Sequence, residues 1–225
     1  MSRQALVVAV VILHTATNVL AGDLSAKLEL SSARIFRGVE QTDNNLAPSG
    51  AIRYQTDFGL YAGALASQND FRIPDAAFEQ TYFLGYGQQI NSFLNLDLSV
   101  LSYNFIEGSN GTDWEEVHLR LNLDQFTAVT LNYARDWIGN DDSQQIEVSH
   151  LFPISNNWNI QASAGAVFPD NNALSEYFYG EVGVVYGLTS DIYIRADLSG
   201  ADSAARTIFG DRANSNFRLS VGYIF

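Results

Sequence analysis

The sequence predicts an all-β fold, a twelve-stranded antiparallel transmembrane β-barrel, from three features. Runs of roughly ten residues, the length of a tilted strand that spans a membrane, alternate apolar with polar side chains from residue 27 onward. The segments between these runs alternate strictly between long polar stretches and short turns. The chain ends in an amphipathic strand, 216–225, whose apolar face finishes in aromatic residues. Together these features favour a barrel that closes on itself.

The first 21 residues have the pattern of a secretory signal peptide. Arg3 supplies a short positive region, Ala5 to Leu13 an apolar core, and Val19-Leu20-Ala21 a cleavage site with a small residue. The apolar core is too short to cross a bilayer as a helix. We therefore expect two segments, a signal peptide at 1–21 that is removed, and an exported barrel at 22–225.

Twelve strands are predicted, and their alternation is clearest where Leu96, Leu98 and Val100 lie opposite Asp97 and Ser99. No helix is predicted, because a helical period is almost absent from the chain. The expected strands are 27–37, 48–57, 59–69, 77–89, 93–106, 113–123, 126–137, 143–153, 157–168, 176–187, 191–200 and 214–225.

The lengths of the connections give the barrel its orientation. Short turns are expected near 57–58, 90–92, 124–125, 155–156 and 189–190, and long loops at 38–47, 70–76, 107–112, 138–142, 169–175 and 201–213. Outer-membrane barrels combine short periplasmic turns, long extracellular loops and an even strand number. Both chain ends then lie on the periplasmic side. A soluble β-sandwich is the alternative, but it gives no reason for loop lengths to alternate.

The strand 216–225 is expected to close the barrel by pairing with 27–37. Its alternation places Arg218, Ser220 and Gly222 toward the lumen, and Phe217, Leu219, Val221 and Tyr223 toward lipid. The terminal aromatics, Tyr223 and Phe225, resemble the C-terminal signature of bacterial outer-membrane barrels. That resemblance implies an assembly signal read by the barrel-assembly machinery.

The composition restricts the partners of the protein. The formal net charge of −13 becomes −14 once Arg3 leaves with the first 21 residues, and such acidity excludes nucleic acid as a partner. The chain has no cysteine and hence no disulfide. A mean hydropathy of −0.03 is compatible with a membrane barrel, because lipid-facing and lumen-facing residues cancel in the average. Aromatics near strand ends would form the two interfacial girdles: Phe36, Tyr61, Tyr82, Phe93, Trp114, Phe126, Trp137, Phe152, Trp158, Tyr186 and Tyr223.

If the apolar residues face lipid, charged side chains of both signs face the lumen. The candidate pore-lining residues are Arg53, Glu79, Asp97, Glu116, His118, Arg120, Glu147, Glu181, Arg195, Asp197 and Arg218, and Lys27, Glu29 and Asp136 share the inward alternation. They either line a narrow aqueous pore or pair across the lumen and plug it. In an open pore, acids outnumber bases, which favours neutral solutes or cations over anions. Arg37 is expected near the mouth of the lumen, where an acid would pair with it.

No catalytic, cofactor or metal site is predicted. His14 leaves with the signal peptide, and neither His118 nor His150 belongs to a recognisable serine–histidine–acid motif. A lipid-modifying barrel enzyme is therefore disfavoured. The loop acids Asp141, Asp142 and Asp170 do not form a calcium-binding loop pattern.

The segment 35–67 resembles the N-terminal signature of the TorF-type porin family of Proteobacteria. The residues that carry the resemblance are 35–42, 48–50, Tyr54, 59–63 and 66–67. Glu40, Ser49 and Leu65 stand where that family has serine, glutamine and tryptophan. The resemblance implies an outer-membrane barrel that forms a channel, with no catalytic residue.

The sequence thus predicts an outer-membrane porin of a Gram-negative bacterium, in contact with membrane lipid. Small polar solutes would diffuse passively through its lumen, without a cofactor. The alternative is a non-conducting barrel that acts as a structural or interaction protein through acidic extracellular loops.

Overall fold

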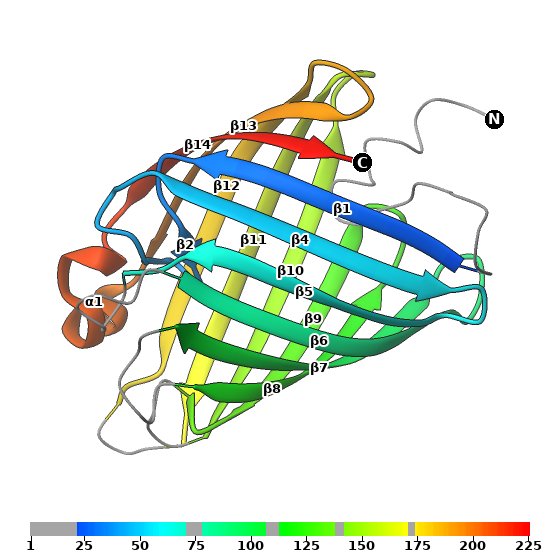
Figure 1. The fold of residues 1–225 in the computed structure, drawn as a ribbon. Coiled ribbons are helices and arrows are strands. Elements are labelled where there is room, and N and C mark those ends of the chain that lie inside the picture. The colour runs from blue at the N-terminus through cyan, green and yellow to red at the C-terminus, as the bar shows by residue number, and fades with distance from the viewer. Residues whose placement is uncertain (1–21, 71–77, 107–112, 138–141, 171–173) are drawn as a thin grey trace.

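The computed structural model describes residues 22–70, 78–106, 113–137, 142–170 and 174–225, and within them twelve strands close into a barrel (Figure 1). The predicted signal peptide lies outside these residues. The barrel strands are β1 (Gly22–Ser31), β4 (Ala47–Thr56), β5 (Leu60–Gln68), β6 (Phe78–Gln89), β7 (Asn95–Ile106), β8 (Trp114–Asn122), β9 (Thr127–Arg135), β10 (Ser143–Pro153), β11 (Trp158–Pro169), β12 (Tyr177–Gly187), β13 (Ile192–Ala201) and β14 (Asn216–Ile224). The predicted all-β barrel is confirmed.

Each strand pairs antiparallel with its neighbours, and β14 pairs with β1 to close the barrel. The seam runs from Lys27 opposite Ile224 to Ser31 opposite Ser220. Phe225 extends it, since its N–H and C=O bond to the backbone of Ala26 at 3.0 and 2.8 Å. The predicted pairing of the C-terminal strand with the first strand is confirmed, but the first strand is 22–31 and not 27–37.

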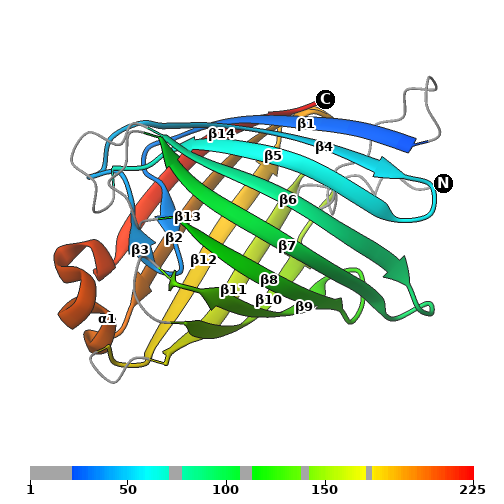
Figure 2. The same cartoon turned by 60° about the horizontal axis from the view of Figure 1, so that its bottom comes forward.

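The exterior of the barrel is apolar, and polar residues alternate toward the interior. On β14, Phe217 is 58% exposed and Leu219 47%, whereas Ser220 is buried. The strands tilt around the barrel (Figure 2), and the same alternation continues on every strand from β1 onward. Apolar side chains cover this outer surface, so it is suited to contact with lipid and not with water.

Loop lengths alternate as predicted. Short turns join β4 to β5, β6 to β7, β8 to β9, β10 to β11 and β12 to β13, and the longer connections lie at the opposite end of the barrel. The eleven later barrel strands begin and end within two residues of the predicted positions. Strand β9 ends at Arg135, earlier than predicted, and this changes the position of Asp136, which was expected to face the lumen. It follows the last residue of β9 and its side chain is exposed.

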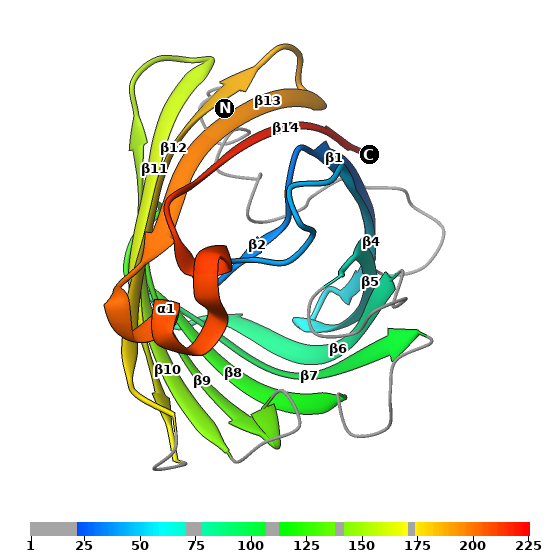
Figure 3. The same ribbon diagram turned by 90° about the vertical axis from the view of Figure 1, so that its left-hand side faces the viewer.

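The first long connection forms a second hairpin inside the barrel. Its strands are β2 (Ile35–Phe36) and β3 (Val39–Glu40), and Figure 3 shows β2 within the ring of barrel strands. The prediction that 27–37 is one continuous strand is wrong, because β1 ends at Ser31. The apolar pair Ile35-Phe36 belongs to this inner hairpin instead.

The last long connection contains the helix α1 (Ser203–Phe209) and the 3₁₀ helix η4 (Gly210–Ala213), where no helix was predicted. The carboxylate of Asp202 caps α1 by accepting from the N–H of Ala205 at 3.0 Å. A helix this short shows too little periodicity to be recognised in a sequence. Among the described residues, no helix is long and apolar enough to cross a membrane.

Candidate functional site: the lumen and its inner hairpin

The turn of the inner hairpin needs an unusual backbone. Arg37 and Gly38 both have positive φ, 52° and 78°. Two consecutive residues of this kind make the tight turn that suits a two-residue β-hairpin. A Cβ atom on Gly38 would lie 2.6 Å from Cβ of Tyr179 and 2.9 Å from the carbonyl oxygen of Gly200. The hairpin tip is therefore pressed against the wall formed by β12 and β13.

Arg37 anchors the tip to a second part of the wall. Its Nη2 donates to Oε2 of Glu116 on β8 at 2.7 Å, and Glu116 has no exposed surface. The indole N–H of Trp114 donates to the same carboxylate at 2.9 Å, and Nε2 of His118 lies 2.6 Å from it. The expected pairing of Arg37 with an acid is confirmed, but the pair is buried within the lumen. Several hydrogen bonds compensate the cost of burying this carboxylate.

Two further arginines hold the hairpin. At its base, Arg34 forms a bidentate pair with Glu79 on β6, with distances of 2.8 and 2.6 Å. Asn69 also donates to Glu79, at 2.8 Å. From η4, Arg212 reaches Glu40 at 3.4 Å and Asp43 at 2.6 Å. The inner hairpin is thus bonded to the barrel wall and to the last loop.

An apolar cluster surrounds the hairpin on the α1 side of the barrel. Val39 packs with Trp114, Trp137 and Tyr177, and Phe209 of α1 completes the cluster from above. Trp137 and Tyr177 are almost fully buried. This part of the lumen is filled by side chains, as in the core of a soluble protein.

The prediction of the aromatic girdles is wrong for four residues. Phe36, Tyr61, Trp114 and Trp137 were expected at the lipid interface, but all four point into the barrel. Other aromatic residues of the predicted girdles are exposed, as contact with the membrane interface requires. They include Tyr82, Phe93, Phe152, Trp158 and Tyr223.

Four of the predicted pore-lining residues form one closed group of ion pairs on β12, β13 and β14. Arg218 contacts Asp197 at 2.6 Å and Glu181 at 3.1 Å. Arg195 contacts Asp197 at 2.7 Å and also pairs with Glu181. Two arginines and two carboxylates neutralise one another, and each arginine bridges both acids. Such a network fixes its members in place.

The remaining candidates are distributed around the lumen. Glu79, Glu116 and His118 belong to the hairpin anchors. Arg53 stacks over the ring of Tyr61 at 3.7 Å. Asp97 accepts from the hydroxyl of Tyr61 at 2.6 Å, Glu147 accepts from Tyr179 at 2.9 Å, and Arg120 donates to Asn122 at 3.1 Å. No role is predicted for Arg34, Glu40 or Arg212. Arg34 falls on the lipid-facing alternation of the expected strand 27–37, and Glu40 and Arg212 lie in the expected long loops.

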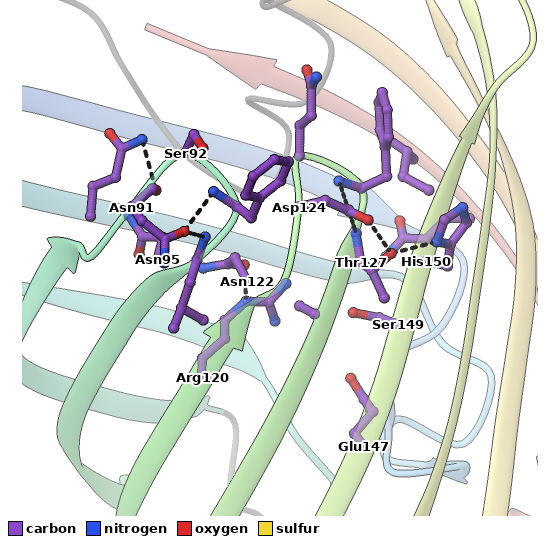
Figure 4. A pocket seen from close by; sticks show the side chains of 18 residues that line it. Asn91, Ser92, Asn95, Arg120, Asn122, Asp124, Thr127, Glu147, Ser149 and His150 are labelled. Carbon is purple, nitrogen blue, oxygen red and sulfur yellow. Dashed lines mark hydrogen bonds between the residues drawn. The ribbon is translucent and has the colours of Figure 1, made fainter.

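Two of the cavities lined by described residues lie inside the barrel. One, of about 470 Å³, opens among the short turns and is lined by residues including Asn122 and Ser149 (Figure 4). The other, of about 350 Å³, lies directly beneath the hairpin tip and is lined by Arg37 and Arg195. Arg120, Glu147 and Gln161 line both cavities. The two spaces therefore meet at these three side chains.

Neither His118 nor His150, the two histidines among the described residues, takes part in a nucleophile–histidine–acid relay. His150 Nδ1 lies 2.9 Å from Oγ1 of Thr127, but Asp124 contacts Thr127 at 3.0 Å and is not bonded to the imidazole. A nucleophile–histidine–acid relay requires the acid to orient the histidine. His118 faces Glu116 and has no hydroxyl partner among its hydrogen bonds.

No group of metal-binding side chains occurs among the described residues. Of the loop acids, Asp141 lies outside those residues. Asp142 accepts from the hydroxyl of Tyr133 and from the N–H of Asp136, and the hydroxyl in particular lowers the pKa of the Asp142 carboxyl. Its oxygens are thus engaged within the loop.

Comparison with known proteins identifies relatives at the level of family and fold. The sequence model of a family described as a bacterial protein of unknown function, Gcw_chp, matches residues 16–220. No curated protein matches the sequence.

The solved structures with a similar fold include the following outer-membrane channels. A KdgM porin in complex with disordered oligogalacturonate gives a TM-score of 0.59 at 10% identity, over 90% of this chain and 98% of that one. The NanC porin gives 0.56 at 10% identity, over 89% and 98%. The COG4313 outer membrane channel from Pseudomonas putida F1 gives 0.51 at 12% identity, over 94% and 99%. At these identities the likeness concerns the fold.

Proposed function

The chain belongs to the Gcw_chp family, and we propose that it is an outer-membrane channel for the passive diffusion of small polar solutes. The observation that carries this proposal is the pair of cavities that meet at the polar side chains of Arg120, Glu147 and Gln161 inside a closed barrel. A lumen lined by charged and amide side chains can replace the hydration of a small polar solute, which an apolar lumen cannot. The resemblance to TorF-type porins agrees with this function and stays a prediction.

The inner hairpin limits the size of what can pass. Its tip lies between the cavity of about 350 Å³ and the apolar cluster around Trp137. Solutes must therefore pass beside the hairpin or displace it. This geometry favours single small molecules over long polymers, and a low conductance for ions.

A second function is favoured by the same hairpin. The pairs Arg37–Glu116 and Arg34–Glu79, together with the apolar cluster, fill much of the lumen at the long-loop end. If the hairpin never moves, the protein is a non-conducting structural or interaction barrel. Its acidic long loops would then carry the function.

Single-channel recording in planar bilayers tests both functions. We would compare the wild-type barrel with a variant in which residues 35–40 are replaced by a short Gly-Ser linker. Resistance of the folded barrel to dodecyl sulfate before heating serves as the folding control for both proteins. For the wild type we expect small conductance steps, and for the variant larger ones.

Each result decides between the two functions. Steps in both proteins support the channel. Steps only in the linker variant support the non-conducting barrel. Absence of steps in both folded proteins, at all voltages, contradicts the channel.

A further inference from the structure

Most charged side chains inside the barrel are neutralised by ion pairs. Lys27 pairs with Glu29, and the hairpin anchors and the group on β12–β14 account for most of the others. Within the described part of the lumen, four of the predicted pore-lining residues have no partner of opposite charge at ion-pair distance: Arg53, Asp97, Arg120 and Glu147. These four differ from the rest in that no opposite charge contacts them directly. Arg120 is attracted by Glu147 and Asp97 only over a longer distance.

Three of the four lie in one cross-strand row. Asp97 on β7 is paired in register with Arg120 on β8, Arg120 with Thr130 on β9, and Thr130 with Glu147 on β10. Adjacent strands are about 4.8 Å apart, so Arg120 and Glu147 lie roughly 10 Å apart at the backbone. We call Asp97, Arg120, Thr130 and Glu147 the charged row. It presents an arginine between two acids.

Neutral partners fix these charges in position. The hydroxyl of Tyr61 donates to Asp97 at 2.6 Å, and that of Tyr179 donates to Glu147 at 2.9 Å. Arg120 donates to Asn122 at 3.1 Å and to Thr130 at 3.4 Å. Hydroxyl and amide groups orient a charged side chain without cancelling its charge. The row is therefore preorganised to meet charges of a ligand.

The charged row lies where the two cavities meet. Arg120 and Glu147 both line each cavity, and Figure 4 shows their side chains extending from two strands of the same wall into one space. A solute that crosses from one cavity to the other must pass these two side chains.

We propose that the charged row is a binding site for small zwitterions, such as amino acids, on their way through the channel. Arg120 binds the carboxylate, for which its planar guanidinium is suited, and Glu147 binds the ammonium group. A simple anion is repelled by Asp97 and Glu147, and a simple cation leaves Arg120 without an anion. A molecule that carries both charges satisfies both ends of the row. This inference rests on the proposed channel function and specifies its solute class.

Liposome swelling with the full mature chain tests the proposal. The probes are glycine and glycolamide, two molecules of nearly the same size of which only glycine is a zwitterion. The measured quantity is the ratio of the glycine rate to the glycolamide rate, which cancels differences in the amount of inserted protein. The variants are Arg120→Gln and Glu147→Gln. The control, Arg135→Gln, removes the same charge from an exposed position at the end of β9.

We expect the wild-type ratio of the glycine rate to the glycolamide rate to exceed the ratio for free diffusion in water. It should fall at least about threefold in Arg120→Gln and in Glu147→Gln, as for the loss of one partly solvated charge contact. Arg135→Gln should match the wild type. If glycolamide passes and the ratio is unchanged in both lumen variants, the zwitterion site is refuted and the channel stands. If neither probe passes through the folded wild type, the channel itself fails.

Discussion

The guanidinium of Arg37 donates to the carboxylate of Glu116 over 2.7 Å, joining two residues that are 79 positions apart in the chain. The bond holds the tip of the inner hairpin on the wall of the barrel. Replacing Arg37 by alanine should release the tip and leave a buried carboxylate without its cation. We expect larger single-channel conductance and a loss of stability on the order of 3 kcal/mol.

The double variant Arg37→Ala/Glu116→Gln is the matched control for that prediction. Removing both charges should restore most of the stability, because the uncompensated carboxylate is gone, while the conductance stays high. Unfolding in urea and bilayer recording measure the two effects. Unchanged conductance in both variants would show that the tip stays in place without this bond.

The contact of Gly38 with the barrel wall can be tested by a pair of glycine substitutions. In Gly38→Ala, the new methyl group would meet Tyr179 and the carbonyl oxygen of Gly200, and φ of 78° is strained as well. In Gly210→Ala, φ of 65° is also strained, but no atom lies within 4 Å of the new methyl group. Both variants should be destabilised by roughly 1–3 kcal/mol through the backbone.

Only Gly38→Ala should also alter the conductance, because only there is the hairpin pushed from the wall. Equal conductance in the two variants would mean that the close approach of Gly38 to Tyr179 does not position the hairpin.

Phe225 should be needed for membrane insertion. Two variants distinguish the contribution of its ring from that of its backbone hydrogen bonds. Its backbone makes two hydrogen bonds with Ala26 at the seam, and its ring lies 5.3 Å from that of Tyr223. Deletion of Phe225 removes the bonds and the ring, whereas Phe225→Ala removes the ring alone. If the aromatic side chain is an assembly signal, both variants should lower the amount of protein in the outer membrane. Normal levels of Phe225→Ala would assign the effect to the seam.

Asp124 should make the turn between β8 and β9 sensitive to acid. Its carboxylate accepts from the N–H groups of Phe126 and Thr127 at 2.7 and 2.5 Å, and these bonds lower the pKa of the carboxyl below its usual value. Its contribution to stability is therefore complete above the unfolded pKa of about 3.9 and is lost as the pH falls through the lower folded value.

The corresponding experiment compares unfolding rates of the wild type and Asp124→Ala. The variant should unfold faster at neutral pH, and the difference should become smaller in strong acid, where the carboxyl is neutral. Asp124→Asn keeps an acceptor oxygen but not the charge, so at neutral pH its unfolding rate should lie between those of the wild type and Asp124→Ala. A pH-independent difference for Asp124→Ala would contradict the role of the ionised carboxyl.

The barrel was predictable from the sequence because its determinants are local. Leu96, Leu98 and Val100 alternate with Asp97 and Ser99, and each short turn is only a few residues long. The predicted start of the first strand, at residue 27, is too late. Gly22 directly follows the predicted signal peptide, and the alternation of Asp23 and Ser25 with Leu24 is too short to mark a strand at that boundary. Ile35-Phe36 was assigned to the same strand, since a two-residue strand has no period of its own.

The interior was not predictable to the same depth. That Arg218 faces the lumen follows from alternation, but its pairing with Asp197 depends on the register between β13 and β14. The bond between Arg37 and Glu116 depends on a loop that turns inward, for which no local pattern exists. The sequence leaves an open pore and a plugged lumen as alternatives, and the structure contains cavities and interlocked ion pairs together.

The salt bridges from Arg212 to Glu40 and Asp43 have a consequence for the order of assembly. They connect the first long loop to the last one, across 172 residues in the case of Glu40. Contacts of such high sequence separation form late, after the chain between them is in place. The bonds of Arg34 and Arg37 to the barrel wall do not depend on the last loop, whereas the bonds of Arg212 do. Completion of the last loop therefore secures the internal hairpin from a second side.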